Sequence, residues 1–240
     1  MDRHESVDPL ATEAARLEHA YARRNRSKYV WTSHGHEFAL QERERNTLAL
    51  LRRYRVIPLG DNRILELGCG SGDWLVQFIR WGASPDRITG IDLRDDALAR
   101  ARAALPQSVR LEHGNAAALP FDAASFDIVL QSTVFTSVLD RDIRERIAAE
   151  MLRVLQPGGL IIWYDFLVDN PKNPDVRGMR KNEIRTLFSG CRFDLQRVTL
   201  LPPLVRWLAP RSWLLTYALS HVPVFCTHYF GAITRFMGRA

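Results

Sequence analysis

Cysteine is scarce in this sequence, and long apolar runs are absent. The three cysteines, Cys69, Cys191 and Cys226, are odd in number and widely spaced, which argues against a disulfide framework or a zinc site. We therefore expect a reducing, cytoplasmic compartment. The first 25 residues are charged and lack the apolar core of a signal peptide. Every apolar stretch is shorter than a membrane span, so no transmembrane segment is expected.

Long blocks of like charge are also missing, although the formal net charge is +6. A basic chain can bind nucleic acid, an anionic membrane surface or a phosphorylated substrate. Basic and aromatic residues are not interleaved as they are on RNA-binding surfaces, so we expect a solvated, Arg-rich surface and no nucleic-acid partner. The aromatic, proline-broken segment Leu200–Phe236 is expected to cover the core or the substrate, with peripheral membrane contact as an alternative.

The sequence does contain a regular alternation of short apolar runs and helical patterns. The predicted strands are Arg63–Leu67, Arg87–Leu93, Val109–Glu112, Phe126–Gln131, Leu160–Phe166 and Cys191–Leu200, with a last strand around His228. The predicted helices are Pro9 to about Arg26, Gln41–Arg55, Asp73–Trp81, Asp95–Ala104, Arg141–Leu155 and Glu183–Phe188. This alternation indicates an open α/β sheet with helices on both faces, within one domain.

A glycine-rich turn follows the first predicted strand, with Gly68, Gly70 and Gly72 at alternate positions. Glycine allows a positive φ and lets a ligand approach the backbone closely. The G-x-G-x-G spacing differs from the dinucleotide fingerprint G-x-G-x-x-G, and Asp73 stands where the third glycine of that fingerprint would be. An Asp there repels a phosphate but tolerates a ligand with an amino-acid tail. No P-loop pattern is present.

Asp92 comes about twenty residues after this turn, at the end of the next predicted strand. A carboxylate in that place can accept hydrogen bonds from both ribose hydroxyls of an adenosine. The alternative is a helix-capping role. Turn and carboxylate together indicate a ligand that combines an adenosine with an amino-acid tail.

These motifs resemble those of class I S-adenosylmethionine-dependent methyltransferases, in particular the branch similar to the ubiquinone- and menaquinone-biosynthesis enzymes. The resemblance spans about Arg63 to Ile162. The matching motifs are Glu66-x-Gly68-x-Gly70-x-Gly72, Asp92, Gly114–Phe121, Ser125–Val129 and Leu155–Gly159. The family usually has Asp where this chain has Asn115, whose carbonyl oxygen can still accept the adenine amino hydrogen.

The resemblance implies a Rossmann-like, seven-stranded, mostly parallel sheet with S-adenosylmethionine as cofactor. Residues 1–56 would form an N-terminal helical lid, and residues 57–240 a single methyltransferase domain with a substrate-covering insertion at about 166–225 and a C-terminal extension. The implied cofactor-binding residues are Glu66, Gly68, Cys69, Gly70, Gly72, Asp92, Leu93, Asn115, Ala116 and Gln131.

Methyl transfer is an in-line displacement, so the protein mainly aligns the acceptor and excludes water. A general base is needed only for a neutral hydroxyl or a carbon acid. Asp165 is the first candidate base, with ordering of the following loop as the alternative. His36, expected in a lid segment ahead of the Gln41 helix, is the second, with a surface or capping role as the alternative. No metal is expected, because Gln131 stands where magnesium-dependent relatives have an acid.

We expect O-methylation of a small-molecule or glycan-precursor acceptor. The alternatives are C-methylation of a quinone-like or other aromatic ring, and a non-catalytic protein that binds S-adenosylmethionine. A further hypothesis is a phosphorylated acceptor such as a nucleotide sugar, which would contact Arg177, Arg180, Arg185, Arg192 and Arg197.

Overall fold

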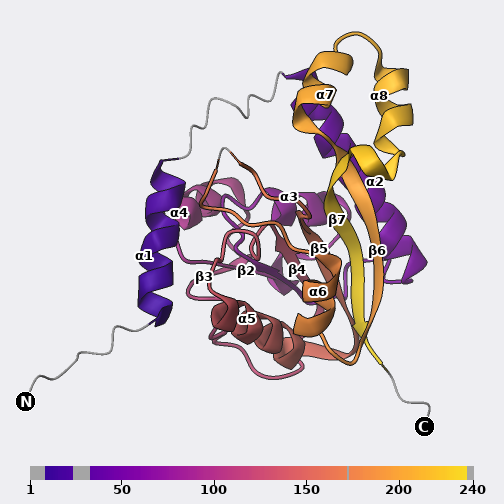
Figure 1. Cartoon of the computed structure of the whole chain (residues 1–240). Helices are drawn as coiled ribbons and strands as arrows, with labels where there is room; N and C mark the ends of the chain where they lie inside the picture. Colours follow the sequence, from indigo (N-terminus) through magenta and orange to yellow (C-terminus); the bar gives the residue numbers. More distant parts are fainter. Residues whose placement is uncertain (1–8, 24–32, 172, 237–240) are drawn as a thin grey trace, which may run out of the picture.

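The computed structural model describes residues 9–23, 33–171 and 173–236. Its centre is a seven-stranded sheet in the order β3-β2-β1-β4-β5-β7-β6 (Figure 1). The strands from β1 to β5 pair in parallel, and β7 runs antiparallel to both of its neighbours. The bounds are β1 Ile64–Leu67, β2 Ile88–Asp92, β3 Arg110–His113, β4 Phe126–Ser132, β5 Leu155–Phe166, β6 Cys191–Leu200 and β7 Cys226–Arg235. The expected seven-stranded, mostly parallel sheet is confirmed.

Helices cover both faces of the sheet, as predicted. The helices are α1 Pro9–Ala22, α2 His34–Arg53, α3 Asp73–Arg80, α4 Asp95–Ala104, α5 Arg141–Val154, α6 Lys181–Leu187, α7 Pro202–Leu208 and α8 Trp213–Ser220. Apolar residues of α1, α5 and α6 pack with one set of strand side chains, and those of α2, α3 and α4 pack with the other. Because neighbouring strand residues point to opposite faces, Val129 belongs to the first set while Ile128 and Leu130 belong to the second.

The sheet order creates a crevice where a ligand can bind. From β1 the chain proceeds outward to β2 and β3, and then returns to place β4 on the other side of β1. Loops from the carboxyl ends of β1 and β4 therefore diverge in opposite directions. In open α/β sheets ligands bind at this point.

The start of α2 differs from the prediction. The helix begins at His34 instead of Gln41, so His34 and His36 lie in its first turn and not in a loop ahead of it. Gly35 lets the start of α2 pack closely on α7, because a side chain at that position would meet the Arg206 backbone of α7 at 3.3 Å. Packing of α2 on α7 is a tertiary contact that local sequence does not reveal.

Three further elements differ from the prediction. The helices α7 and α8 were not predicted, because both are short and lie between prolines. Strand β5 begins at Leu155 instead of Leu160, and its register against β4 shifts between Phe126 and Ile128. The motif Leu155–Gly159 is thus part of an irregular strand start.

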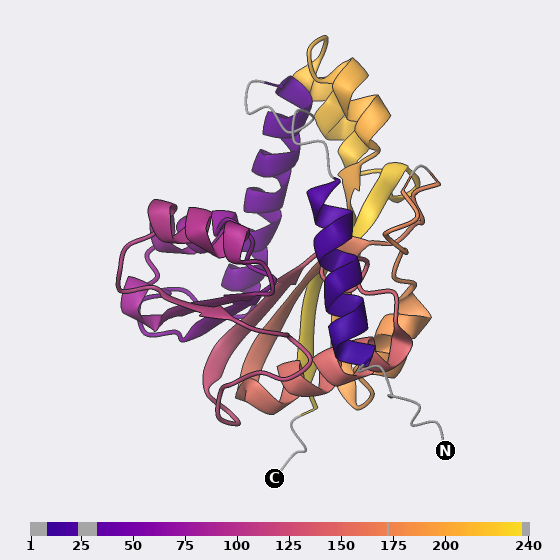
Figure 2. The same ribbon diagram turned by 90° about the vertical axis from the view of Figure 1, so that its left-hand side faces the viewer.

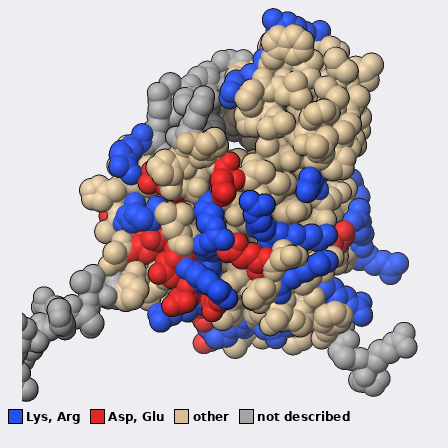
Figure 3. Space-filling view, in the orientation of Figure 1, with Lys and Arg blue, Asp and Glu red and all other residues tan. Residues whose placement is uncertain are grey.

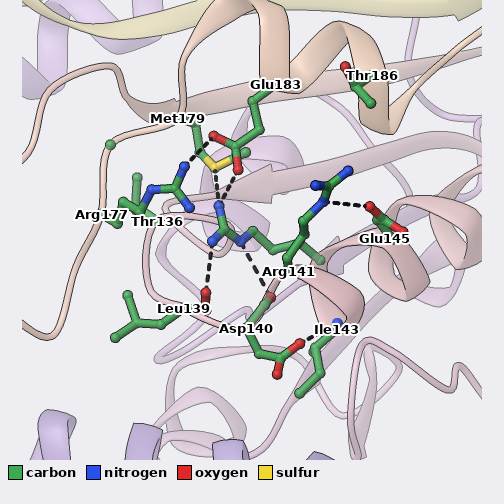
Figure 4. A network of polar contacts seen from close by, with 12 residues as sticks. Thr136, Leu139, Asp140, Arg141, Ile143, Glu145, Arg177, Met179, Glu183 and Thr186 are labelled. Carbon is green, nitrogen blue, oxygen red and sulfur yellow. Dashed lines mark hydrogen bonds and ion pairs between the residues drawn. The ribbon is translucent and has the colours of Figure 1, made fainter.

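A buried arginine joins α5 to the segment after β5 (Figure 4). Arg144 is only 1% exposed. Its guanidinium donates to Glu183 Oε1 at 2.5 Å, to the Leu139 carbonyl at 2.8 Å and to Met179 Sδ at 3.3 Å. Glu183 also accepts from Arg177 at 3.1 Å. This network fixes the segment that follows β4 against α5 and α6.

Candidate active site

A cavity of about 430 Å³ lies at the carboxyl ends of β1, β2 and β4. The glycine turn, the end of β2 and the segment after β4 form much of its wall. Helix α1 crosses this edge of the sheet (Figure 2) and contributes Glu13, Leu17 and Tyr21 to the wall. Of the predicted cofactor residues, those that line the cavity are Glu66, Gly68, Cys69, Gly70, Asp92, Leu93, Asn115 and Ala116.

The glycine turn has the backbone conformation that its sequence predicts. Gly68, Gly70 and Gly72 have φ values of 63°, 56° and 82°. A Cβ on Gly68 would meet Val134 at 2.8 Å, whereas a Cβ on Gly70 would point into open space. Gly70 therefore leaves its backbone open to a ligand in the cavity, while Gly72 packs against Leu105 and does not line the cavity.

Asp92 is held rigidly at the end of β2. One carboxylate oxygen accepts from the Gly70 backbone N–H at 2.8 Å, and the other accepts from the Arg94 N–H at 2.9 Å. The residue is 7% exposed and lines the cavity. Each carboxylate oxygen can accept more than one hydrogen bond, so Asp92 retains acceptor sites for a diol.

A second carboxyl group lies at the glycine-turn end of the cavity. Glu66 is 2% exposed, and its Oε2 has no hydrogen-bond partner among the described residues. Burial raises its pKa well above the usual value, Asp73 and Asp92 add to this effect, and Arg43 opposes it. The Arg43 guanidinium lies 4.3 Å from the centre of the Trp74 ring. Glu66, Arg43 and Trp74 all line the cavity, so this end offers a carboxyl group, a cation and an aromatic ring to a zwitterionic tail.

Asn115 lies on the β3 side of the cavity, and its side-chain oxygen already has one hydrogen-bond partner. Its Oδ1 accepts from the Ala117 N–H at 2.9 Å. An adenine amino group would therefore share this oxygen, while the side-chain amide N–H groups remain available to an acceptor.

Gln131 contributes to the site indirectly. It is fully buried and does not line the cavity. Its Oε1 accepts from the Val134 N–H at 3.2 Å, and its Nε2 has no hydrogen-bond partner in the part of the chain that the structure describes. Gln131 therefore orients the segment after β4, and its predicted contact with the cofactor stays a prediction.

The two candidate bases lie outside the cavity wall. Asp165 is fully buried, and its carboxylate accepts from Thr136 Oγ1 at 2.5 Å and from the Phe166 N–H at 3.0 Å. Burial raises its pKa to about 7, against the hydrogen bonds from Thr136. His36 lies in the first turn of α2, where burial and then Arg43 lower its pKa. Asp165 thus holds the segment after β4 through Thr136, and catalysis by either residue stays a prediction.

The basic residues considered for a phosphorylated acceptor do not meet in the cavity. Arg177 is ion-paired with Glu183, and neither Arg177 nor Arg180 lines the wall. The described residues of the predicted insertion at 166–225 do not line it either. Its predicted role as a cover over the acceptor stays a prediction.

No residue of α1 was predicted to belong to the site, although this helix forms one side of the cavity. The signal was present, because Leu10, Ala14, Leu17 and Tyr21 follow a helical period. Glu13 Oε1 fastens the helix by accepting from the Leu139 N–H at 2.7 Å. The Arg94 guanidinium lies 4.4 Å from the centre of the Tyr21 ring.

Comparison with known proteins agrees with this site. A family described as "Methyltransferase domain" matches residues 64–159. A demethylmenaquinone methyltransferase of Staphylococcus aureus is 34% identical over 102 residues, which are 42% of this chain and 41% of that protein. The chain thus spans less than half of the length of the curated relatives it matches.

Solved structures show the same fold. A SAM-dependent methyltransferase of Methanosarcina mazei is 22% identical with a TM-score of 0.55, covering 75% of this chain and 94% of that one. The cyclase SpnF is 19% identical with a TM-score of 0.60, covering 82% of both chains. Fold, cavity and sequence match agree: residues 64–159 match a methyltransferase domain, and the chain shares its fold with S-adenosylmethionine-dependent methyltransferases of known structure.

Proposed function

We propose that this protein transfers a methyl group from S-adenosylmethionine to a small molecule with an apolar ring. The observation that carries the proposal is the composition of the cavity. One part of its wall holds Asp92, Asn115 and Glu66, and another part is apolar. The apolar residues are Leu17, Val134, Val138, Ile143 and Ile147.

The residues present fit the cofactor. Asp92 would accept the ribose hydroxyls, and Asn115 with Ala116 would contact the adenine. At the other end, Glu66 has an unpartnered oxygen and Arg43 a positive charge, which suit the ammonium and the carboxylate of the amino-acid tail. The bound cofactor would supply a methyl group on a sulfonium, which is a good leaving group.

The chain's own contribution to the chemistry is orientation and exclusion of water. Helix α1 closes one side of the cavity with Leu17 and Tyr21. Gln131 and Asp165 fix the segment after β4, and Val134 and Ser137 of this segment face the cavity. These contacts hold the apolar part of the wall, where the acceptor would bind, at a fixed distance from Asp92, Asn115 and Glu66.

The acceptor we favour is a quinone-like ring methylated on carbon. The apolar wall suits such a ring. The Staphylococcus aureus relatives are named demethylmenaquinone methyltransferases, and this name points to the same acceptor class. O-methylation of a small molecule or glycan precursor is the second candidate. Neither Asp165 nor His36 lines the wall, so the candidate bases do not distinguish a hydroxyl from a carbon acceptor.

Calorimetric titration with S-adenosylmethionine and S-adenosylhomocysteine tests the cofactor. Asp92→Ala should weaken binding by about a hundredfold or more, because it removes a charged acceptor for two hydroxyls. Asp95→Ala is the matched control, since its carboxylate is 84% exposed and does not line the cavity. Equal affinity in both variants would contradict the assigned site.

Transfer of a labelled methyl group to demethylated quinones and to phenolic acceptors tests the reaction. Carbon methylation, identified by NMR of the product, would support the favoured acceptor, and a methyl ether would support the second candidate. Tight cofactor binding without transfer to any acceptor would favour the non-catalytic alternative.

A further inference from the structure

The helices α7 and α8 form a hairpin, Leu201–Phe225, that projects from one end of the molecule (Figures 1 and 2). The hairpin rests on the first half of α2. The Phe38 ring lies 5.0 Å from the Trp213 ring, and Gly35 packs against Arg206. The remaining faces of the hairpin lie outside the sheet and its two layers of helices.

Helix α8 has its polarity inverted relative to an ordinary surface helix. Thr216 and Ser220 are 0% and 5% exposed, and their hydroxyls donate to carbonyls of the same hairpin. Leu214 and Leu215 are instead 78% and 47% exposed. A helix in water usually places its apolar residues inward, so this outer face is suited to an apolar neighbour.

The exposed apolar surface continues over the rest of the hairpin. Trp207 is 57% exposed and Val224 is 70% exposed. The other large apolar residues that are exposed here are Leu201, Trp213, Tyr217 and Val222. Of the exposed large apolar side chains in the described part of the chain, most are thus gathered on one projection.

The charge on this surface has one sign. The sequence contains no Asp or Glu after Asp194. Arg206 and Arg211 are exposed on the hairpin, and the Arg211 guanidinium lies 5.1 Å from the centre of the Trp207 ring. Figure 3 shows the projection as a largely tan surface with blue atoms at its tip. Glu37 is an exposed acid close to the hairpin, but it belongs to α2, on which the hairpin rests. The outer faces of α7 and α8 themselves carry no acidic residue.

We infer that the α7–α8 hairpin is a docking surface for a membrane that contains anionic lipids. Exposed Trp and Leu side chains enter the boundary between headgroups and acyl chains, where aromatic residues are favoured. Arginines beside them attract anionic headgroups. With seven and eight residues, α7 and α8 are far too short to cross a bilayer, so they would lie at its surface.

The hairpin is connected to the cavity through one helix. On α2, Phe38 contacts the hairpin and Arg43 lines the cavity, five residues later. At a rise of about 1.5 Å per residue, these contacts are roughly 8 Å apart along the helix axis. Docking would therefore place the cavity close to the membrane surface.

Flotation of the full chain with vesicles tests the inference. We expect binding to vesicles of phosphatidylcholine mixed with phosphatidylglycerol, and weaker binding to phosphatidylcholine alone. Trp207→Ser with Leu214→Ser should lower the partition coefficient by about tenfold or more. The matched control, Ile57→Ser with Val168→Ser, changes two exposed apolar residues elsewhere and should bind as the wild type does.

The contribution of the hairpin's positive charge is tested with a second pair of variants in the same flotation assay. Arg206→Glu with Arg211→Glu should abolish the preference for anionic vesicles. Arg141→Glu with Arg146→Glu makes the same charge change on exposed positions of α5 and should reduce binding much less. Trp207→Phe should retain binding but lose part of the fluorescence quenching by brominated acyl chains, because residue 207 would lie within their reach.

Absence of vesicle binding by the wild type, or equal loss in the hairpin and control variants, would overturn the inference. Concentration-dependent dimerisation that only the hairpin variants abolish, without vesicle binding, would overturn it in favour of a contact between two copies. Cofactor titration of the same variants is an independent measurement. Vesicle binding without cofactor binding would contradict the proposed function alone.

Discussion

Asn115 is the predicted cofactor-binding residue that departs from the family pattern. Its side-chain oxygen already accepts from the Ala117 N–H, so an adenine amino group would have to share this oxygen. The other polar atom of the side chain is a donor and cannot accept from the amino group. The family resemblance places an Asp here, whose second oxygen would accept.

We expect Asn115→Asp to tighten binding of S-adenosylmethionine by about three- to tenfold, because it adds an acceptor for the amino group. Asn115→Ala should weaken binding, because the Ala117 N–H loses its partner. Calorimetry on the two variants checks both directions. Unchanged affinity in both would show that adenine does not bind beside Asn115.

Asp165 determines part of the pH dependence of stability. Burial raises its pKa from 3.8 to about 7, so between these values the folded state holds more protons than the unfolded state. The free energy of unfolding therefore falls as the pH rises from about 4 to 7, by at most about 1.4 kcal/mol per pH unit from this group.

Urea unfolding of the wild type and of Asp165→Asn at several pH values checks this. The variant should lack the part of the slope that Asp165 supplies, whereas the buried Glu42 and Glu66 contribute to both proteins. Parallel stability curves for the two proteins would contradict a raised pKa at Asp165.

At the scale of secondary-structure elements, α5 carries two arginines with different energetic roles. Arg144 is buried and donates to Glu183, Leu139 and Met179. Arg141 is 73% exposed and pairs with Glu145 one turn along the same helix. Arg144 therefore joins different elements of the fold, whereas the Arg141 ion pair stays within α5.

Arg144→Ala should lower the free energy of unfolding by about 3 to 5 kcal/mol, because it leaves the Leu139 carbonyl without this donor and the Glu183 carboxylate with only the exposed Arg177. Arg141→Ala, the control on the same helix, should change it by about 0.5 kcal/mol or less. Chemical denaturation followed by circular dichroism measures both. Similar losses would mean that the Arg144 network adds no stability beyond an exposed pair.

At the scale of the whole molecule, α1 covers the cavity by contacts with two separate regions. Glu13 accepts from the Leu139 N–H, Arg16 donates to the Ser137 carbonyl, and the Tyr21 ring lies beneath the Arg94 guanidinium. These regions follow β4 and β2, which both border the cavity. A ligand in the cavity would touch the helix and both regions together.

Hydrogen exchange should therefore slow in Pro9–Ala22 by severalfold when S-adenosylhomocysteine is bound, because α1 must open for its amides to exchange. Lys181–Leu187, which does not line the cavity, serves as the internal reference. Equal exchange of α1 with and without ligand would contradict its role as a cover.

The sequence by itself determined the class of fold, and most of the residues that it predicted for the cofactor line one cavity. Strand and helix periodicity placed β1 to β6, and α4 and β6 agree residue for residue. The glycine turn and Asp92 could be predicted because both belong to one βαβ unit, in which chain order nearly fixes spatial order. Local chemistry was therefore enough to locate the carboxyl ends of β1 and β2.

Tertiary structure alone decided which distant side chains reach the cavity. Arg43 and Tyr21 line it because whole helices pack there, whereas Asp165 lies at the carboxyl end of strand β5 and yet turns toward Thr136. The same holds for α8, whose Thr216 is buried and whose Leu214 is exposed. Periodicity shows that a helix has two faces, but the direction each face takes depends on the neighbours against which the helix packs.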